Sequence, residues 1–185
     1  DLLDRGIRAN AKEKYRRANL IELPDCGQLI VTGDLHGHRR NYQKIVTFAD
    51  LENNPDCHLI FQEIIHGGPQ NEQGGCLSYE LLFKAIEYKL DFPARVHFIL
   101  ANHDTAFVNT SQVMKTGQEM NRSMREALDT EFGEDSWDVK KAIAQFLFSQ
   151  ALAVKCHNGI WVSHSLPASH YMDKVNPEIF ERNLN

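Results

Sequence analysis

The chain has 185 residues, of which 42% are hydrophobic and 24% charged, a composition typical of a folded globular protein and not of a disordered one. Its formal net charge of −5 excludes a general nucleic-acid binder, which needs a basic surface to neutralise phosphates. The four cysteines form no CxxC pair, so we expect reduced thiols in a cytoplasmic protein. No apolar stretch approaches membrane-span length, so we expect no membrane partner.

Helix-like and strand-like segments alternate along the chain. Residues 5–20 are rich in Ala, Lys and Arg and predict a solvated helix. Short apolar runs predict strands at residues 28–32, 58–65, 96–100 and 159–163. Apolar faces at helical spacing predict helices over 81–90 and 139–147. Segment 109–135 predicts a packed helix, with a lid over a site as the alternative. This alternation predicts an α/β layered fold with helices on the sheet faces.

Residues with metal-ligand or proton-transfer chemistry stand at or near the end of each predicted strand. They lie in the stretches GDLHGH (33–38), EIIHGGP (63–69), ANHD (101–104) and SHSLP (163–167). Any one of them has a structural explanation as a core histidine, an Asn turn or a helix N-cap. Ligands of α/β folds collect beyond the carboxyl ends of strands, so four such stretches together predict a functional site there. His38, His97 and His157 are interpreted as packing residues.

These stretches resemble the motifs of the calcineurin-like metallophosphoesterases, which read GDxHG, GDxVDRGP, GNHE or GNHD, and HGGL. The likeness is greatest to the branch of the serine/threonine phosphoprotein phosphatases and the bacterial diadenosine-tetraphosphate hydrolases, and runs over residues 28–167. It implies a layered α/β/β/α sandwich of mixed sheets, with the metal site at the carboxyl ends of the strands. Residues 1–185 would form one such domain, incomplete at its C-terminus.

The resemblance also implies a ligand set for two divalent metal ions, with Mn²⁺ preferred over Fe, Zn or Mg. Asp34 and His36 would bind the first metal, and Asn102 and His164 the second. Glu63 corresponds to the bridging aspartate of the family. Its role agrees with chemistry, because burying a lone carboxylate is costly and two nearby cations need an anion between them.

The implied reaction is hydrolysis of a phosphate ester by a metal-bound hydroxide. His103 would be the general acid for the leaving oxygen. Because His66 stands where the family has the aspartate that orients this histidine, neighbouring Asp104 is the candidate for that role. The substrate would be a small phosphorylated molecule or a phosphoprotein. Hydrolysis of a nucleotide pyrophosphate bond and metal binding without turnover are the alternatives.

Several positions depart from the family pattern. Glu63 is one methylene longer than the expected aspartate, and His66 stands where the family has an aspartate that orients the catalytic histidine. No further histidine motif for the second metal follows Pro167. Either the chain is truncated or this metal lacks a ligand.

The arginine with which the family grips phosphate corresponds to Gly67. Arg39 and Arg40, which follow GDLHGH, are candidates to replace it as substrate-binding residues. Their alternative is a solvated helix face. Gly67 and Glu63 favour an inactive relative, whereas the intact metal ligands favour an enzyme.

Overall fold

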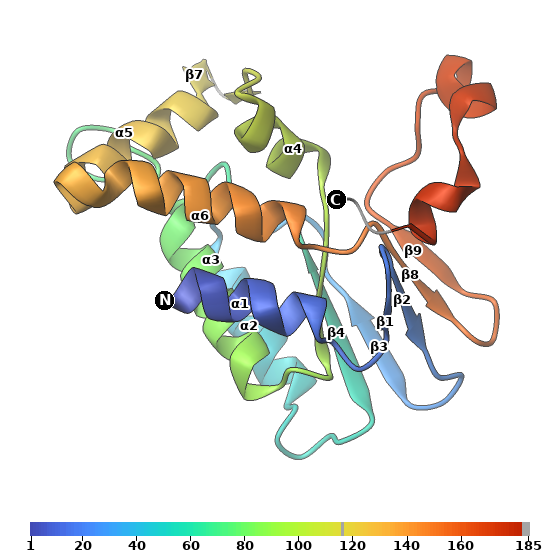
Figure 1. The fold of residues 1–185 in the computed structure, drawn as a ribbon. Helices are drawn as coiled ribbons and strands as arrows, with labels where there is room; N and C mark the ends of the chain where they lie inside the picture. The colour runs from blue at the N-terminus through green and yellow to red at the C-terminus, as the bar shows by residue number, and fades with distance from the viewer. Residues whose placement is uncertain (116, 183–185) are drawn as a thin grey trace.

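The computed structural model describes residues 1–115 and 117–182. The helices are α1 (Leu2–Ala11), α2 (Arg39–Ala49), α3 (Ser78–Asp91), α4 (Asn102–Asn109), α5 (Met120–Phe132) and α6 (Ser136–Phe148), with 3₁₀ turns η1 (Gly133–Asp135), η2 (Ser169–Lys174) and η3 (Pro177–Phe180). The strands are β1 (Arg16–Arg17), β2 (Leu20–Leu23), β3 (Gln28–Val31), β4 (Cys57–Gln62), β5 (Val96–Ile99), β6 (Met114–Lys115), β7 (Gln118–Glu119), β8 (Ala153–Cys156) and β9 (Trp161–Ser163). Figure 1 shows their arrangement.

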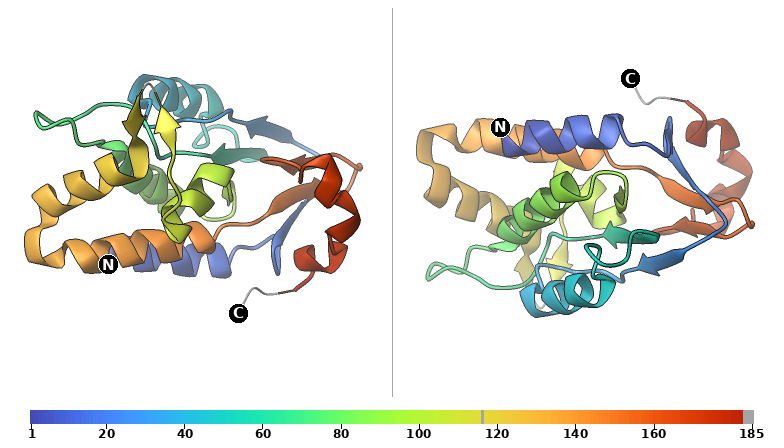
Figure 2. Two further views of the ribbon diagram at one scale, coloured as in Figure 1. Left: turned by 90° about the horizontal axis from the view of Figure 1, so that it is seen from above. Right: turned by 90° about the horizontal axis from the view of Figure 1, so that it is seen from below.

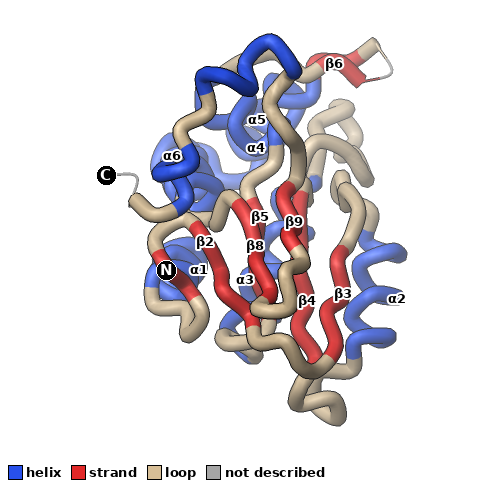
Figure 3. The backbone as a smooth tube through the Cα atoms, turned by 90° about the vertical axis from the view of Figure 1, so that its right-hand side faces the viewer, coloured by secondary structure: helices blue, strands red, loops and turns tan. Residues whose placement is uncertain are grey.

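The strands form two stacked sheets and a separate hairpin. The first sheet is parallel, in the order β3-β4-β5. The second is mixed, in the order β1-β2-β8-β9, with β2 and β8 parallel and the outer pairs antiparallel. Figure 3 shows the strands of the two sheets one behind the other. β6 and β7 form a two-stranded hairpin.

The core lies on both faces of the parallel sheet. On one face, the larger cluster packs the sheet against the helices, and α1 lies beside α6 in both views of Figure 2. On the other, fully buried side chains from both sheets meet, among them Ile21, Ile60, Ile99 and Val154. The 3₁₀ turn η3 contacts the outer side of the second sheet, where Phe180 packs edge-on against Trp161. No helix in the described part of the chain has the length and apolar character that a bilayer crossing requires.

The helix predicted over 5–20 is wrong in its bounds, but its basic residues Arg5, Arg8, Lys12 and Lys14 are exposed, as a solvated face requires. α1 ends at Ala11, and the chain then forms the antiparallel strands β1 and β2, of which β2 also pairs with β8. α1 packs closely against α3 and α6. The close approach is visible at Gly6, where an added Cβ would lie only 2.8 Å from Ile86 Cγ2. Strand β8 itself was not expected.

The other predicted elements correspond to observed ones. The expected strands are found as β3, β4, β5 and β9, and the expected helices as α3 and α6. Within segment 109–135, the packed helix begins only at Met120. The short strands β6 and β7 precede it. β4 ends at Gln62, so Glu63 lies just beyond the strand and not inside it.

A buried ionic network joins Glu13, which follows α1, to residues of α3, β4 and β5. The Glu13 carboxylate is 2.9 Å from Lys89 Nζ and bonds His97 Nδ1, and His97 Nε2 lies 2.9 Å from His58 Nδ1. Burial opposes ionisation of Glu13, but the hydrogen bond and charge of His97 and the charge of Lys89 hold its pKa below the usual range. His97 is thus a packing residue, as predicted, within a charged cluster.

We expect Glu13→Gln to destabilise the fold by about 3–5 kcal/mol, because it leaves the Lys89 ammonium buried without its counter-charge. Urea unfolding measures the change. Glu13→Gln/Lys89→Met should recover much of the loss, and Glu131→Gln, on the surface, should change little. A loss below about 1 kcal/mol for Glu13→Gln would mean that the pair does not hold this region together.

Candidate metal centre

The predicted metal ligands follow the strands of the parallel sheet at one edge. Val31 of β3 pairs with Ile60 of β4, so Asp34 and Glu63, each three residues further on, leave the sheet together. Strand β5 leads into α4, which begins at Asn102. Strand β9 of the second sheet ends at Ser163, which places His164 at the same edge.

Backbone contacts tie together the loops that follow β3 and β4. The amides of Leu35 and His36 both donate to the Glu63 carbonyl at 2.9 Å. The loops touch so closely that a Cβ at Gly37 would lie 2.5 Å from the Gly67 carbonyl oxygen, and a Cβ at Gly67 would lie 2.6 Å from the His36 oxygen. Position 67 therefore has no room for a side chain.

Three residues of these loops adopt left-handed backbone conformations. Their φ angles are 44° at His36, 44° at Glu63 and 69° at His66. Such conformations cost free energy in residues with a Cβ and concentrate at functional sites. At Glu63, the turn occurs directly after β4.

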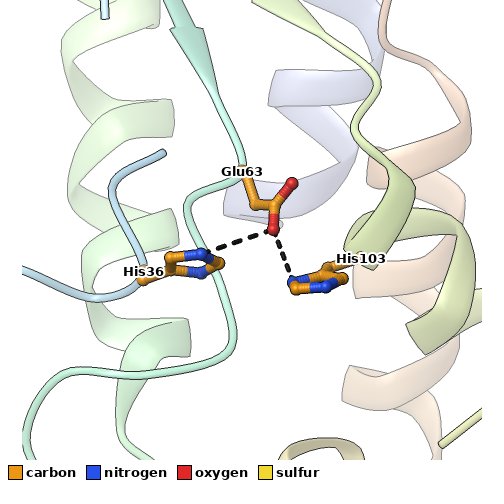
Figure 4. A group of neighbouring side chains, drawn as sticks. All are labelled: His36, Glu63 and His103. Carbon is orange, nitrogen blue, oxygen red and sulfur yellow. Dashed lines mark ion pairs between the residues drawn. The ribbon is translucent and has the colours of Figure 1, made fainter. Parts of the chain in front are cut away.

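The Glu63 carboxylate is the centre of the cluster. Its Oε1 lies 3.4 Å from His36 Nε2 and 2.5 Å from His103 Nδ1, as Figure 4 shows. Its Oε2 lies 2.8 Å from His164 Nε2. The side chain is only 2% exposed, and burial, followed by the negative charges of Asp34 and Asp104, raises its pKa to about 7. A bound cation would keep this carboxylate ionised at neutral pH.

The tautomer of His36 follows from its backbone partner. Nδ1 lies 3.0 Å from the Ile65 carbonyl oxygen, which can only accept, so Nδ1 carries the proton of the neutral ring. Nε2 then presents its lone pair to Glu63 Oε1 and to Asp34 Oδ2, at 3.4 and 3.8 Å. A metal cation, like a proton on Nε2 or on one of the carboxylates, would relieve the repulsion between this lone pair and the two carboxylates.

The same reasoning applies to His164. Gln62 donates from Nε2 to the Thr32 carbonyl, which turns its Oε1 toward His164 Nδ1 at 3.0 Å. Nδ1 therefore donates to Gln62. Nε2 lies 2.8 Å from Glu63 Oε2 and 2.7 Å from Asn102 Oδ1, an oxygen that can only accept. A metal cation that replaced the Nε2 proton would meet these two oxygens as further ligands.

Two groups of donors could each hold a metal ion, and Glu63 belongs to both. One group joins His36, Glu63 and His103, and the other joins Asp34, Glu63 and His164, with the ligand atoms of each group within 4.8 Å of one another. Glu63 Oε2 and His103 Nδ1 are buried and, although close to His164 Nε2 and Glu63 Oε1, form no hydrogen bond of suitable geometry in the described part of the chain. Imidazole and carboxylate together suit first-row transition metals.

The two groups differ in detail from the ligand set that the resemblance implies. His103, expected to be the general acid, lies in the first group, and Asp34, assigned to the first metal, lies in the second. The His103 side chain is 31% exposed, and its pKa is lowered by burial and then by the nearby His36. Its role as acid stays a prediction.

Neither group of possible metal ligands includes Asp104, and the predicted substrate-binding residues Arg39 and Arg40 lie outside both groups as well. Asp104 caps α4, where its Oδ2 accepts from the Ala101 amide at 3.2 Å and from Gln150 Nε2 at 3.3 Å. Burial raises its pKa to about 7. Arg39 forms an ion pair with Glu80 of α3, and Arg40 is exposed on α2. Orientation of His103 and phosphate binding by the arginines stay predictions.

Two supporting residues were missed by sequence reasoning. Gln62 holds the His164 ring, and its signal was a polar residue at the end of an apolar strand. Asn121 of α5 bonds the buried His66 ring, which packs edge-on against His103 at 5.7 Å between ring centroids. Burial lowers the pKa of His66 to about 4, so this ring is neutral at pH 7.

We expect Gln62→Leu to weaken binding of the metal held by His164 by about 10- to 100-fold, because the ring loses the acceptor that fixes its tautomer. Calorimetric titration with Mn²⁺ measures both sites. The exposed Gln43→Leu in α2 is the control, and its affinities should be unchanged. Unaltered binding in Gln62→Leu would show that the ring is oriented without this amide.

Comparison with known proteins shows the fold. The sequence matches no family model and no curated protein. The structure is similar to that of a protein serine/threonine phosphatase from Saccharomyces cerevisiae with similarity to human phosphatase PP5, with a TM-score of 0.64 and 15% identity. The match covers 97% of this chain and 50% of that one, so the chain spans about half the length of that phosphatase. It confirms the predicted layered α/β fold of the calcineurin-like phosphoesterases.

Proposed function

We propose that this chain is a metallophosphoesterase that hydrolyses a phosphate ester with two divalent metal ions, Mn²⁺ before Fe, Zn or Mg. The observation that carries the proposal is the Glu63 carboxylate, shared by two groups of metal-ligand atoms at the carboxyl ends of the parallel strands. The phosphatase-like fold supports it. We further propose the serine/threonine phosphatase and diadenosine-tetraphosphate hydrolase branch, on the motifs of the sequence.

Each residue of the site would have a distinct task. When bound, the metal pair supplies a nucleophile by lowering the pKa of water and neutralises phosphate charge. Glu63 would balance the charge of the two cations, while the rings of His36 and His164 would hold them in place. His103, the partly exposed imidazole beside Glu63, would hold the proton for the leaving oxygen.

The substrate phosphate also needs positive charge from the protein. Position 67 has no space for an arginine, and the Arg39 guanidinium is already paired with Glu80. The positive charge of Lys115 of β6 acts on both Glu63 and His103, so positive charge is present near the cluster. We propose a small phosphorylated molecule or a phosphoprotein in the cytoplasm as substrate.

An inactive metal-binding relative is the second candidate, favoured by the missing arginine at Gly67. To separate the two, we would strip the protein with EDTA, reload it with Mn²⁺, and measure bound metal by mass spectrometry together with turnover. The substrates would be para-nitrophenyl phosphate, phosphoserine and diadenosine tetraphosphate, with the surface variant Asp25→Asn as control.

Two bound metals with hydrolysis of a phosphate monoester would support the proposal. Two metals without turnover of any substrate would establish the inactive relative, and turnover of the dinucleotide alone would make the protein a pyrophosphate hydrolase. A chain that binds no metal would refute both candidates.

A further inference from the structure

A second hollow lies away from the metal centre. It has a volume of about 420 Å³ and is formed by α1, the residues that follow it, and the turn from α3 to β5. That turn includes Pro93 and Ala94 and precedes β5, whereas the metal ligands follow the other end of the same strand. The hollow and the metal centre are therefore at opposite edges of the parallel sheet.

Four cations line this hollow. Arg5, Arg8 and Lys12 are exposed and lie at helical spacing on one face of α1 and the residue after it, and exposed Lys14 follows. Across residues 1–115 and 117–182, none of the four has an ion-pair partner or a side-chain hydrogen bond, although Lys14 lies over the Tyr15 ring. The chain carries 25 acidic residues against 20 basic ones, so four unpaired cations around one hollow are a marked local excess.

The single acidic residue of the lining does not neutralise them. Glu13 is buried, and its two oxygens are engaged by Lys89 and His97 inside the core. Its charge is thus already compensated within the fold. The hollow keeps a net positive charge toward solvent.

We propose that this hollow binds a small anion with two or more phosphate groups. Two guanidinium groups match phosphate oxygens in forked pairs, and the two lysines add point charges for a second phosphate. The volume lies in the range of small-molecule sites. Leu90 and Pro93 give the hollow an apolar wall for a non-ionic part of the ligand. This site is independent of the metal centre and of the function proposed for it.

The test is calorimetric titration of the EDTA-treated chain, in which the metal centre holds no cation to attract phosphate. The probes are inorganic phosphate, inorganic tripolyphosphate and ATP. We expect one tripolyphosphate per chain, bound more tightly than phosphate and less tightly as salt is raised. If ATP binds more tightly than tripolyphosphate, the ligand class is a nucleotide. If the two bind equally, the ligand class is a free oligophosphate. Either result supports the site.

Variants locate the binding. Arg5→Gln/Arg8→Gln should weaken tripolyphosphate about tenfold or more, whereas Lys84→Gln/Arg122→Gln, with the same charge loss on α3 and α5, should change it less than about twofold. Because exposed side chains are replaced, thermal melting should show an unchanged fold; Arg8→Lys, which keeps the charge, should lose less than Arg8→Gln. Equal losses in the two double variants, no binding of any probe, or tighter binding of an acidic hexapeptide than of tripolyphosphate would overturn the proposal.

Discussion

Glu63→Gln is expected to lose both of the proposed metal ions and, with them, the proposed hydrolysis of phosphate esters. The substitution keeps the size of the side chain but removes the charge between two groups of ligands. Two cations held by these groups would then repel each other without an anion between them. Metal content after desalting, measured by mass spectrometry, and turnover of para-nitrophenyl phosphate give the result.

Two further variants sharpen this test. Glu63→Asp retains the charge and supplies the residue of the family pattern, so it should retain more metal than Glu63→Gln. Glu52→Gln, on the surface, should behave as the unaltered chain. If Glu63→Gln keeps both metals and its rate, Glu63 does not bridge them, and the alignment of the second motif that placed it there must be abandoned.

The position of Glu63 shows what the sequence can and cannot predict. Its presence in the site was predictable, because parallel strands place their carboxyl ends at one edge and the chemistry of each following stretch is visible. The backbone conformation of Glu63 was not predictable. The apolar run from 58 to 65 gives no sign that the strand ends at Gln62 or that Glu63 has a left-handed backbone conformation. That turn depends on contacts with the loop after β3.

Long-range partners account for the other differences. Residues 20–23 form a strand because β8, far away in the sequence, pairs with them. Gln62 acts on His164, 102 residues later, and no local pattern marks such a pair. The glycine at position 67 is visible in the sequence, but its contact with the His36 backbone is a property of the folded loops.

His103 is the residue for which two chemical roles compete most directly. Its Nδ1 is 2.5 Å from Glu63 Oε1 and belongs to one group of possible metal ligands, while its partial exposure suits a proton donor. A general acid contributes roughly 10²- to 10⁴-fold when the leaving oxygen is strongly basic. A nitrophenolate leaves readily without a proton, so the two roles give different results with different substrates.

We expect His103→Ala to lower phosphoserine hydrolysis by about 10²- to 10⁴-fold, to cost far less with para-nitrophenyl phosphate, and to leave the metal content unchanged. Asp34→Asn is the matched comparison: it removes a carboxylate ligand, so metal should be lost and both substrates should suffer alike. Rates on the two substrates and bound metal can be measured on the same preparations. Equal losses on both substrates for His103→Ala, accompanied by lost metal, would make His103 a ligand. The proton donor would then have to be another group, and Lys115, whose charge acts on this cluster, is the next residue to replace.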